Sequence, residues 1–545
     1  MLITLVVWIY ISFITYVLGA VFLRSGYKGR GVQKPVEFYM LTGLAVLMVL
    51  LNFVSLFVGM AWIANSLLFL FCVGYLSFNF SDIKKFTFVS GSKWFWASVL
   101  IFFVFALSQS IRTPFVTDTA LYHAQTIQWF ENYPAVKGLA NIHGRFGFNS
   151  SYHLATALFS FTSFLGTPLH NALPSFLFFI FSVFCLRKIF AKDKRDFAIY
   201  FFSGILLLIM IFYRPWVSSP SPDYPTTVYV LLTLCLLMDW LQSRDAVVLK
   251  LILLFAFVLI TIKVSSIAIL TVPLLMIFWL EHTQRKRFFL YLTLVAALVL
   301  VPWLTRNAII SGYLIYPFPY IDIFSFQWKV PYDLVVTEKE WVKSFARTAS
   351  YNWEWASKLP FQEWFKIWWQ NKTFVEHTIF LVMLISPAIV LFRVRKSQIS
   401  TILILLYLLS FAGVVFWFYM APYFRFAHGF IISCFLVVTY MALYKFRRVM
   451  AISCCAVMLA FSAWSIYKEL EGVSLLEHVL YPQPYEQVSV KQVQKPGFDL
   501  YLPEEGDLCH NHPLPCTPYE QEGLSLIGNK IGEGFYVDTK ARPKK

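Results

Sequence analysis

Two aspartates lie where the chain enters or leaves a long apolar run, an unusual place for a charge. Asp118 belongs to TPFVTDTALYHAQ (113–125), and Asp223 belongs to PWVSSPSPDYPTTVYVLL (215–232). A carboxylate in such a position can take a proton from a substrate hydroxyl or bind a metal. It can also cap the helix that begins beside it, and the sequence leaves both interpretations open.

Three cations occupy comparable positions. Lys263 interrupts the apolar segment FVLITIKVSSIAILTVP, Arg306 follows an apolar run, and Arg425 precedes another. An ionisable residue there is a functional hypothesis by default, although a lysine can also extend to the membrane surface. Arginine and lysine can hold a phosphate. Two acids and three cations at one membrane face therefore predict a substrate that carries phosphate and arrives from the lipid.

Further candidates follow Asp118 in the chain. Tyr122 and His123 belong to the amphipathic segment ALYHAQTIQWF, whereas His143 and Arg145 lie in NIHGRFGFNSS (141–151). These four residues are predicted to contact the substrate. His143 could equally be an ordinary interfacial side chain.

Composition indicates what must position these residues. The 545-residue chain is 59% hydrophobic and 14% charged, and its mean hydropathy is +0.65, whereas a soluble domain is about a quarter charged. Recurring apolar runs predict an all-α polytopic membrane protein with about fourteen spans. The predicted spans are 2–23, 37–58, 61–80, 94–110, 169–187, 197–213, 224–242, 248–262, 266–281, 287–304, 374–393, 399–418, 424–444 and 448–467.

The net charge of +16 is explained by basic cytoplasmic loops, and no nucleic-acid-binding motif accompanies it. The basic segments are RSGYKGRG (24–31), DIKK (82–85), RKIFAKDKR (187–195), TQRKR (283–287), RVRK (393–396) and KFRR (445–448). With all of them in the cytoplasm, the N-terminus is extracytoplasmic, as are 111–168, 214–223, 305–373 and 468–545. This arrangement requires 152–165 to be a helix on the outer membrane surface and not a span.

Two cysteines lie in the predicted extracytoplasmic tail, within CHNHPLPC (509–516). Because that compartment is oxidising, Cys509 and Cys516 could form a disulfide. Alternatively, they could bind zinc together with His510 and His512, or do neither.

The order of these features resembles the GT-C superfamily of integral-membrane glycosyltransferases, which includes bacterial aminoarabinose transferases and protein O-mannosyltransferases. The resemblance covers about residues 94 to 445, and its departures include Val264 where the family has glycine after the lysine. In the family's terms, Asp118 matches the acid of the first outer loop and Asp223 resembles the second acid. The other similar segments are SSYHLATALFSFTSFLG, ITIKVSSIAILTVPLL, PWLTRNAIISGYLIYPF and APYFRFAHGFII. The segments DTALYHAQ and NIHGRFGFNSS also look like those of an uncharacterised group of bacterial membrane proteins.

The chain then divides into three leading spans (1–93), which are a departure from the family, a GT-C-like module (94–467) with outer loops 111–168 and 305–373, and a small extracytoplasmic tail (468–545). The resemblance implies transfer of a sugar from a polyprenyl-phosphate donor to a glycan, lipid or protein acceptor at the outer face of a bacterial inner membrane. Asp118 would be the general base, and Asp223 would help to hold the acceptor or a metal. Lys263, Arg306 and Arg425 would neutralise the donor phosphate.

A divalent metal is compatible with this interpretation but not required, since relatives differ in that respect. Two other functions use similar substrates: a flippase for lipid-linked glycans, and a ligase or polymerase of the O-antigen type. No inverted repeat of the kind found in transporters is evident in the sequence.

Overall fold

The structure is a computed structural model, and it describes residues 1–26, 34–79, 91–114, 116–191, 196–396, 400–471 and 478–540. Within that part, ten helices are long and apolar enough to cross a membrane. The chain is therefore a polytopic, mainly helical membrane protein, as predicted. Four further predicted spans correspond to shorter apolar helices, at Trp62–Phe78, Ala246–Ile262, Val264–Trp279 and His428–Ala442, so the count of fourteen stays a prediction.

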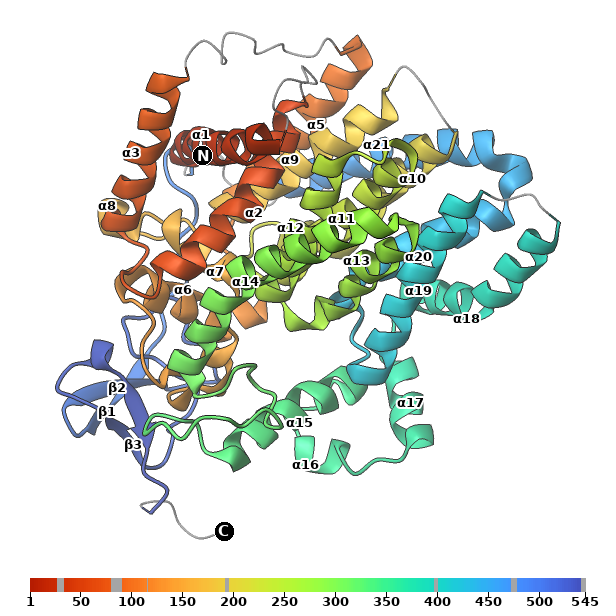
Figure 1. Cartoon of the computed structure of the whole chain (residues 1–545). Helices are drawn as coiled ribbons and strands as arrows, with labels where there is room; N and C mark the ends of the chain where they lie inside the picture. Colours follow the sequence, from red (N-terminus) through yellow and green to blue (C-terminus); the bar gives the residue numbers. More distant parts are fainter. Residues whose placement is uncertain are drawn as a thin grey trace.

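The helices of the apolar bundle make up most of the molecule (Figure 1). They are α1 (Leu2–Gly26), α2 (Val36–Val54), α3 (Trp62–Phe78), α5 (Lys93–Ser110), α9 (Ala172–Ile189), α10 (Asp196–Tyr213), α11 (Asp223–Ser243), α12 (Ala246–Ile262), α13 (Thr271–Met276), α14 (His282–Ser311), α18 (Phe374–Arg395), α19 (Thr401–Met420), α20 (His428–Ala442) and α21 (Arg447–Glu471).

A second group of elements forms a layer at one end of the bundle, which we call the cap and define as residues 116–171, 312–373 and 478–540. Its elements are α6 (Ala124–Asn132), α7 (Ser151–Leu158), α8 (Thr162–Leu165), α15 (Tyr332–Thr348), α16 (Trp353–Ala356), α17 (Phe361–Gln370), β1 (Val490–Lys495), β2 (Phe498–Pro503), β3 (Leu524–Leu526) and β4 (Phe535–Val537). In Figure 1 the labelled strands and α15–α17 lie along the lower edge of the molecule.

The three cap segments are joined through Asn141. Its side-chain amide donates to the carbonyl oxygens of Trp328 (2.9 Å) and Phe535 (3.3 Å), which belong to the other two segments. Backbone hydrogen bonds add to this, since the amide of Phe535 donates to the carbonyl of Lys137. The cap is thus a single layer built from distant parts of the chain.

The leading helices pack into the bundle. The indole of Trp8 in α1 donates to the carbonyl of Ala172 at the start of α9, and Asn65 in α3 donates to the carbonyl of Leu158 in α7. A Cβ on Gly43 of α2 would lie 1.6 Å from the carbonyl oxygen of Thr15 in α1. The predicted leading spans are therefore integrated with the helices that follow them.

The ends of single helices agree with the predicted topology. The helix α14 begins at His282, with Arg285–Arg287 in its first turns, and ends at Ser311, whose carbonyl accepts from the amide of Val330 in the cap. Likewise, α18 starts beside α17 of the cap and ends with Arg393 and Arg395. The basic ends of α14 and α18 thus lie away from the cap. Which compartment each side of the bundle faces stays a prediction. The basic stretches 27–31, 82–85 and 192–195 lie outside the described residues.

Two expectations need correction. The segment 152–165 divides into α7 and α8, and α7 is buried along its whole length against α2, α6 and α12. It is a buried cap helix rather than a surface helix, because α2, α6 and α12 cover it, whereas α8 stays partly exposed. The C-terminal region also contains two antiparallel pairs, β1–β2 and β3–β4, so the protein is not purely helical there.

Candidate functional site

Asp118 and Asp223 each lie at the start of a helix, but neither side chain caps one. Asp118 immediately precedes a π-helical turn, Thr119–His123, which continues into α6, and its carboxylate makes no capping hydrogen bond. Asp223 is the first residue of α11, again without a side-chain cap from the preceding residue. Both carboxylates are instead directed at cations, so the capping explanation does not account for them.

Arg425 joins the two aspartates. It lies in a short 3-10 turn, Phe424–Phe426 (η7), between α19 and α20. Its Nη2 is 2.6 Å from Oδ2 of Asp118, and its Nε is 3.5 Å from Oδ2 of Asp223. Asp223 also pairs with Lys263, the residue that follows α12. Two acids from distant segments therefore share one guanidinium.

Arg145 extends this arrangement on the other side. Its Nη1 is 3.3 Å from Oδ1 of Asp118, and its Nε is 3.8 Å from Oε1 of Glu338 in α15. Acids and cations thus alternate through six side chains, and we call this set the charge network. In order, its members are Glu338, Arg145, Asp118, Arg425, Asp223 and Lys263.

Electrostatics in the network favour the ionised form of Asp118. Burial acts to raise the pKa of its carboxyl, but Arg425, with smaller contributions from His123 and Arg145, outweighs burial and lowers the pKa to about 2. For Glu338 burial prevails over the attraction of Arg145, and its pKa is raised. A carboxylate with so low a pKa is a weak base unless its cations move.

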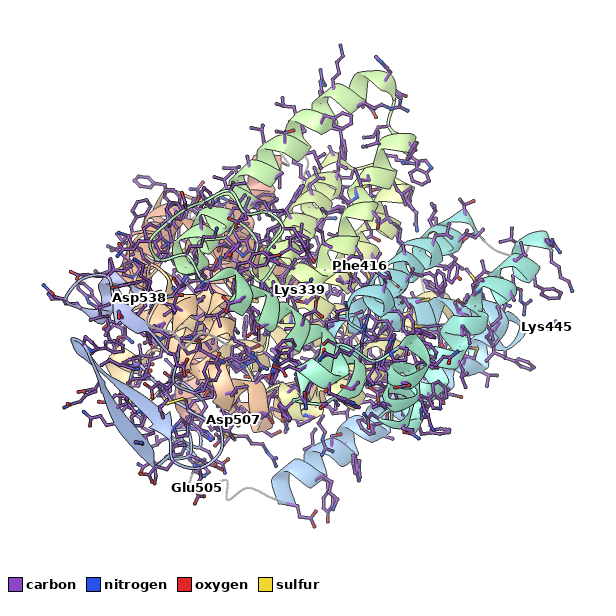
Figure 2. The ribbon with its side chains drawn as sticks, turned by 90° about the horizontal axis from the view of Figure 1, so that it is seen from below. Lys339, Phe416, Lys445, Glu505, Asp507 and Asp538 are labelled. Atoms are coloured by element: carbon purple, nitrogen blue, oxygen red, sulfur yellow. A yellow bond between two sulfur atoms is a disulfide. The ribbon has the colours of Figure 1, made fainter. Side chains whose placement is uncertain are left out.

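The network lies at the head of a cavity of about 1770 Å³. Five of its members line this cavity, all except Glu338. Away from the network the walls are largely apolar, and α18 and α19 contribute much of them. The residues there include Phe380, Met383, Leu384, Phe411, Val414, Val415 and Phe418. Viewed from the cap side, Lys339 of α15 and Phe416 of α19, both lining residues, lie near the middle of the molecule (Figure 2).

Cations outnumber acids on the cavity wall. Six arginines and lysines line it, but only three aspartates or glutamates do. The cations are Arg145, Lys263, Lys339, Lys343, Arg347 and Arg425, and the acids are Asp118, Asp223 and Asp507. Such a wall suits a ligand that combines an anionic group with a long apolar part.

The predicted substrate contacts divide into two groups. Tyr122, His123 and Arg145 line the cavity, and Nδ1 of His123 is 3.3 Å from the Thr119 hydroxyl. Burial holds the pKa of His123 well below its usual range. His143 does not line the cavity, because its ring packs against Phe146 and Tyr519.

Arg306, expected beside Lys263 and Arg425, lies elsewhere. It is 1% exposed and does not line the cavity. Its Nε donates to the Ser55 hydroxyl (3.1 Å), its Nη1 to Oδ1 of Asn149 (3.4 Å), and its Cζ is 3.9 Å from the Phe130 ring centroid. The prediction that Arg306 joins the other two cations is wrong, because the face of α14 that bears it packs inward.

A metal does not fit the site as described. Among the described residues, no group of three or more His, Cys, Asp or Glu side chains is arranged to hold a metal ion. Asp118 and Asp223 are each engaged by cations instead. No step is therefore assigned to a metal.

The C-terminal region docks beside Asp118. Cys509 and Cys516 form a disulfide, so the two sulfurs are bonded to each other rather than to zinc. The backbone amide of His510 donates to the carbonyl of Ala120 (2.8 Å), and the side chain of Gln125 donates to the carbonyl of His512 (2.7 Å). The disulfide loop thus packs on the helical turn that follows Asp118.

Sequence reasoning missed the contribution of α15. None of its charged residues is among the predicted site residues, yet Glu338 pairs with Arg145, and Lys339, Lys343 and Arg347 line the cavity. The missed signal was a run of basic residues at spacing of four in a segment predicted to be extracytoplasmic, where topology does not explain them.

No curated protein and no solved structure matches this chain. A family model described as a domain of unknown function, DUF8201, matches residues 1–432. The match includes all six members of the charge network and the three leading helices, and it stops before the C-terminal strands. Because it covers well over half of the sequence, the chain belongs to the DUF8201 family.

Proposed function

We propose that this protein is an integral-membrane glycosyltransferase that moves a sugar from a polyprenyl-phosphate donor to a glycan, lipid or protein acceptor. The observation that carries the proposal is the position of Asp118, between Arg145 and Arg425, at the head of a large cavity with apolar walls. The polyprenyl chain would lie along α18 and α19, and the reaction would occur at the extracytoplasmic face of a bacterial inner membrane.

In the proposed reaction an acceptor hydroxyl attacks the anomeric carbon of the donor sugar. A new glycosidic C–O bond forms while the bond from that carbon to the phosphate oxygen breaks, and polyprenyl phosphate leaves. The hydroxyl proton passes to Asp118. Lys263 and Arg425 stabilise the negative charge that develops on the leaving phosphate, and Asp223 holds both cations in place.

Donor binding has a second consequence in this mechanism. A phosphate beside Arg425 competes with Asp118 for the guanidinium, because both are anions and both need its N–H groups. Weaker pairing raises the pKa of Asp118, so the carboxylate becomes a better base when the donor is present. In this way Asp118 can act as a base during the reaction although its pKa is about 2 in the protein without donor.

The test uses purified full-length protein and a panel of polyprenyl-phosphate sugars, with consumption of each donor as the readout. Asp118→Asn should reduce turnover by about 10²–10⁴-fold with donor binding retained, and Lys263→Ala should weaken donor binding. Asp507→Asn is the matched control, because Asp507 also lines the cavity but lies outside the charge network.

Equal turnover in the Asp118 variant and the wild type would refute the assignment of the base. If the protein binds lipid-linked sugars but consumes none of them, a flippase for lipid-linked glycans replaces the transferase. Release of a whole glycan from a lipid diphosphate would favour the O-antigen type of ligase.

A further inference from the structure

Three basic residues of α15 share one side of the helix. Lys339, Lys343 and Arg347 are four residues apart, which places them one above another on a helix, and all three line the cavity. Lys339 already has partners, since its Nζ donates to the Tyr320 hydroxyl (2.8 Å) and is 3.3 Å from Oε1 of Glu340. Among the residues that the structure describes, Lys343 and Arg347 lack such polar partners.

Lys343 and Arg347 have no acidic partner within 4 Å among the described residues. The side-chain ammonium of Lys343 also makes no hydrogen bond to any of those residues. Arg347 lies against an aromatic ring, with Cζ 4.8 Å from the Trp364 centroid, and its Nε is buried without an acceptor. An N–H group of a cation that is removed from water and left unpaired is costly, so this pair is suited to an anion supplied by a ligand.

The position of the pair indicates which anion. Arg347 is nine residues beyond Glu338 along α15, so the pair lies up to about 13 Å from the charge network along the helix axis. On its other side, Trp364 contacts Phe418 of α19, with ring centroids 6.1 Å apart, and Phe418 belongs to the apolar wall. The pair therefore stands where the cap meets the apolar wall.

We propose that Lys343 and Arg347 form a second anion-binding subsite, distinct from Lys263 and Arg425, for a phosphate borne by a lipid whose chain lies against α19. Each cation of the first subsite has an aspartate within 4 Å, whereas neither Lys343 nor Arg347 has an acid that close in the part of the chain that the structure describes. The part that this subsite plays in the reaction rests on the proposed function, whereas its binding of a lipid phosphate does not. It holds the phosphate of a lipid acceptor, in addition to the donor phosphate at Lys263 and Arg425.

The experiment measures binding alone, by calorimetry with full-length protein in a neutral detergent. The probes are farnesyl phosphate, farnesyl diphosphate and dioleoyl phosphatidate, with farnesol and dioleoyl glycerol as uncharged counterparts. The variants are Arg347→Gln and Lys343→Gln. The matched control is Lys366→Gln, an exposed lysine of the cap helix α17 that does not line the cavity.

Each subsite variant should weaken the affinity for a lipid phosphate about tenfold, as expected for loss of one charge-assisted contact, and should leave the uncharged probes unchanged. A loss confined to phosphatidate assigns the subsite to a second lipid. A loss confined to the two farnesyl phosphates would mean that the pair contacts the donor phosphate itself, which would overturn a second subsite.

Unchanged affinity for all three phosphates in both variants, or the same loss in Lys366→Gln, would overturn the subsite. A melting temperature equal to that of the wild type shows that each variant is folded. If one of the two variants does not fold, the other still tests the subsite. Because no turnover is needed, a failed subsite and a failed transferase assignment give separate results.

Discussion

At the scale of single residues, Arg425 is the most connected member of the site. It pairs with both aspartates, and aromatic rings surround it, with Cζ 5.2 Å from the Trp216 centroid and 4.9 Å from that of Tyr423. Its position determines how strongly Asp118 holds its charge. Arg425 therefore links the phosphate end of the site to the base.

A pH profile tests this link. With the pKa of Asp118 at about 2, kcat/KM of the wild type should show no acid limb from this group between about pH 5 and pH 8. Arg425→Gln removes the main attraction that opposes burial, so the pKa of Asp118 rises and an acid limb moves up toward that range. A variant that is slower at every pH but has an unchanged profile would contradict the link.

At the scale of elements, the contact of α1 with α2 depends on two glycines. A Cβ on Gly43 would lie 1.6 Å from the Thr15 carbonyl oxygen, and one on Gly19 would lie 2.0 Å from that of Tyr39. Carbonyl oxygens of a helix cannot move aside, so any side chain at either position separates the helices. Small residues permit such close approach between membrane helices.

Gly43→Val should therefore destabilise the protein by about 1–3 kcal/mol, seen as a lower midpoint of thermal unfolding in detergent. The control is Gly74→Val in α3, since a Cβ at Gly74 has nothing within 4 Å. Similar midpoints for the two variants would mean that the close contact of α1 with α2 is not essential to the bundle.

At the scale of the whole molecule, a cap built from three distant segments covers one end of a helical bundle, and the charge network lies where they meet. Cysteine labelling tests which compartment the cap faces. Glu505→Cys, at an exposed position of the cap labelled in Figure 2, should react with a membrane-impermeant maleimide in intact spheroplasts. Gln284→Cys, at the basic end of α14, should react only after permeabilisation. The reverse pattern would invert the proposed topology.

The sequence alone determined the membrane class, because apolar runs of the required length leave few other structures in lipid. It also singled out Asp118, Asp223, Lys263 and Arg425, because a charge at the edge of an apolar segment is costly unless something uses it. These are local properties, and neighbouring residues suffice to show them.

Only the tertiary structure decided which charges meet. Arg306 and Arg425 look alike in sequence, yet one is buried between Ser55 and Asn149 and the other pairs with Asp118. The roles of Glu338, Lys343 and Arg347 likewise depend on how α15 folds over the cavity. The face that a helix turns toward its neighbours is determined by packing between segments hundreds of residues apart, and hydropathy along the chain does not contain that information.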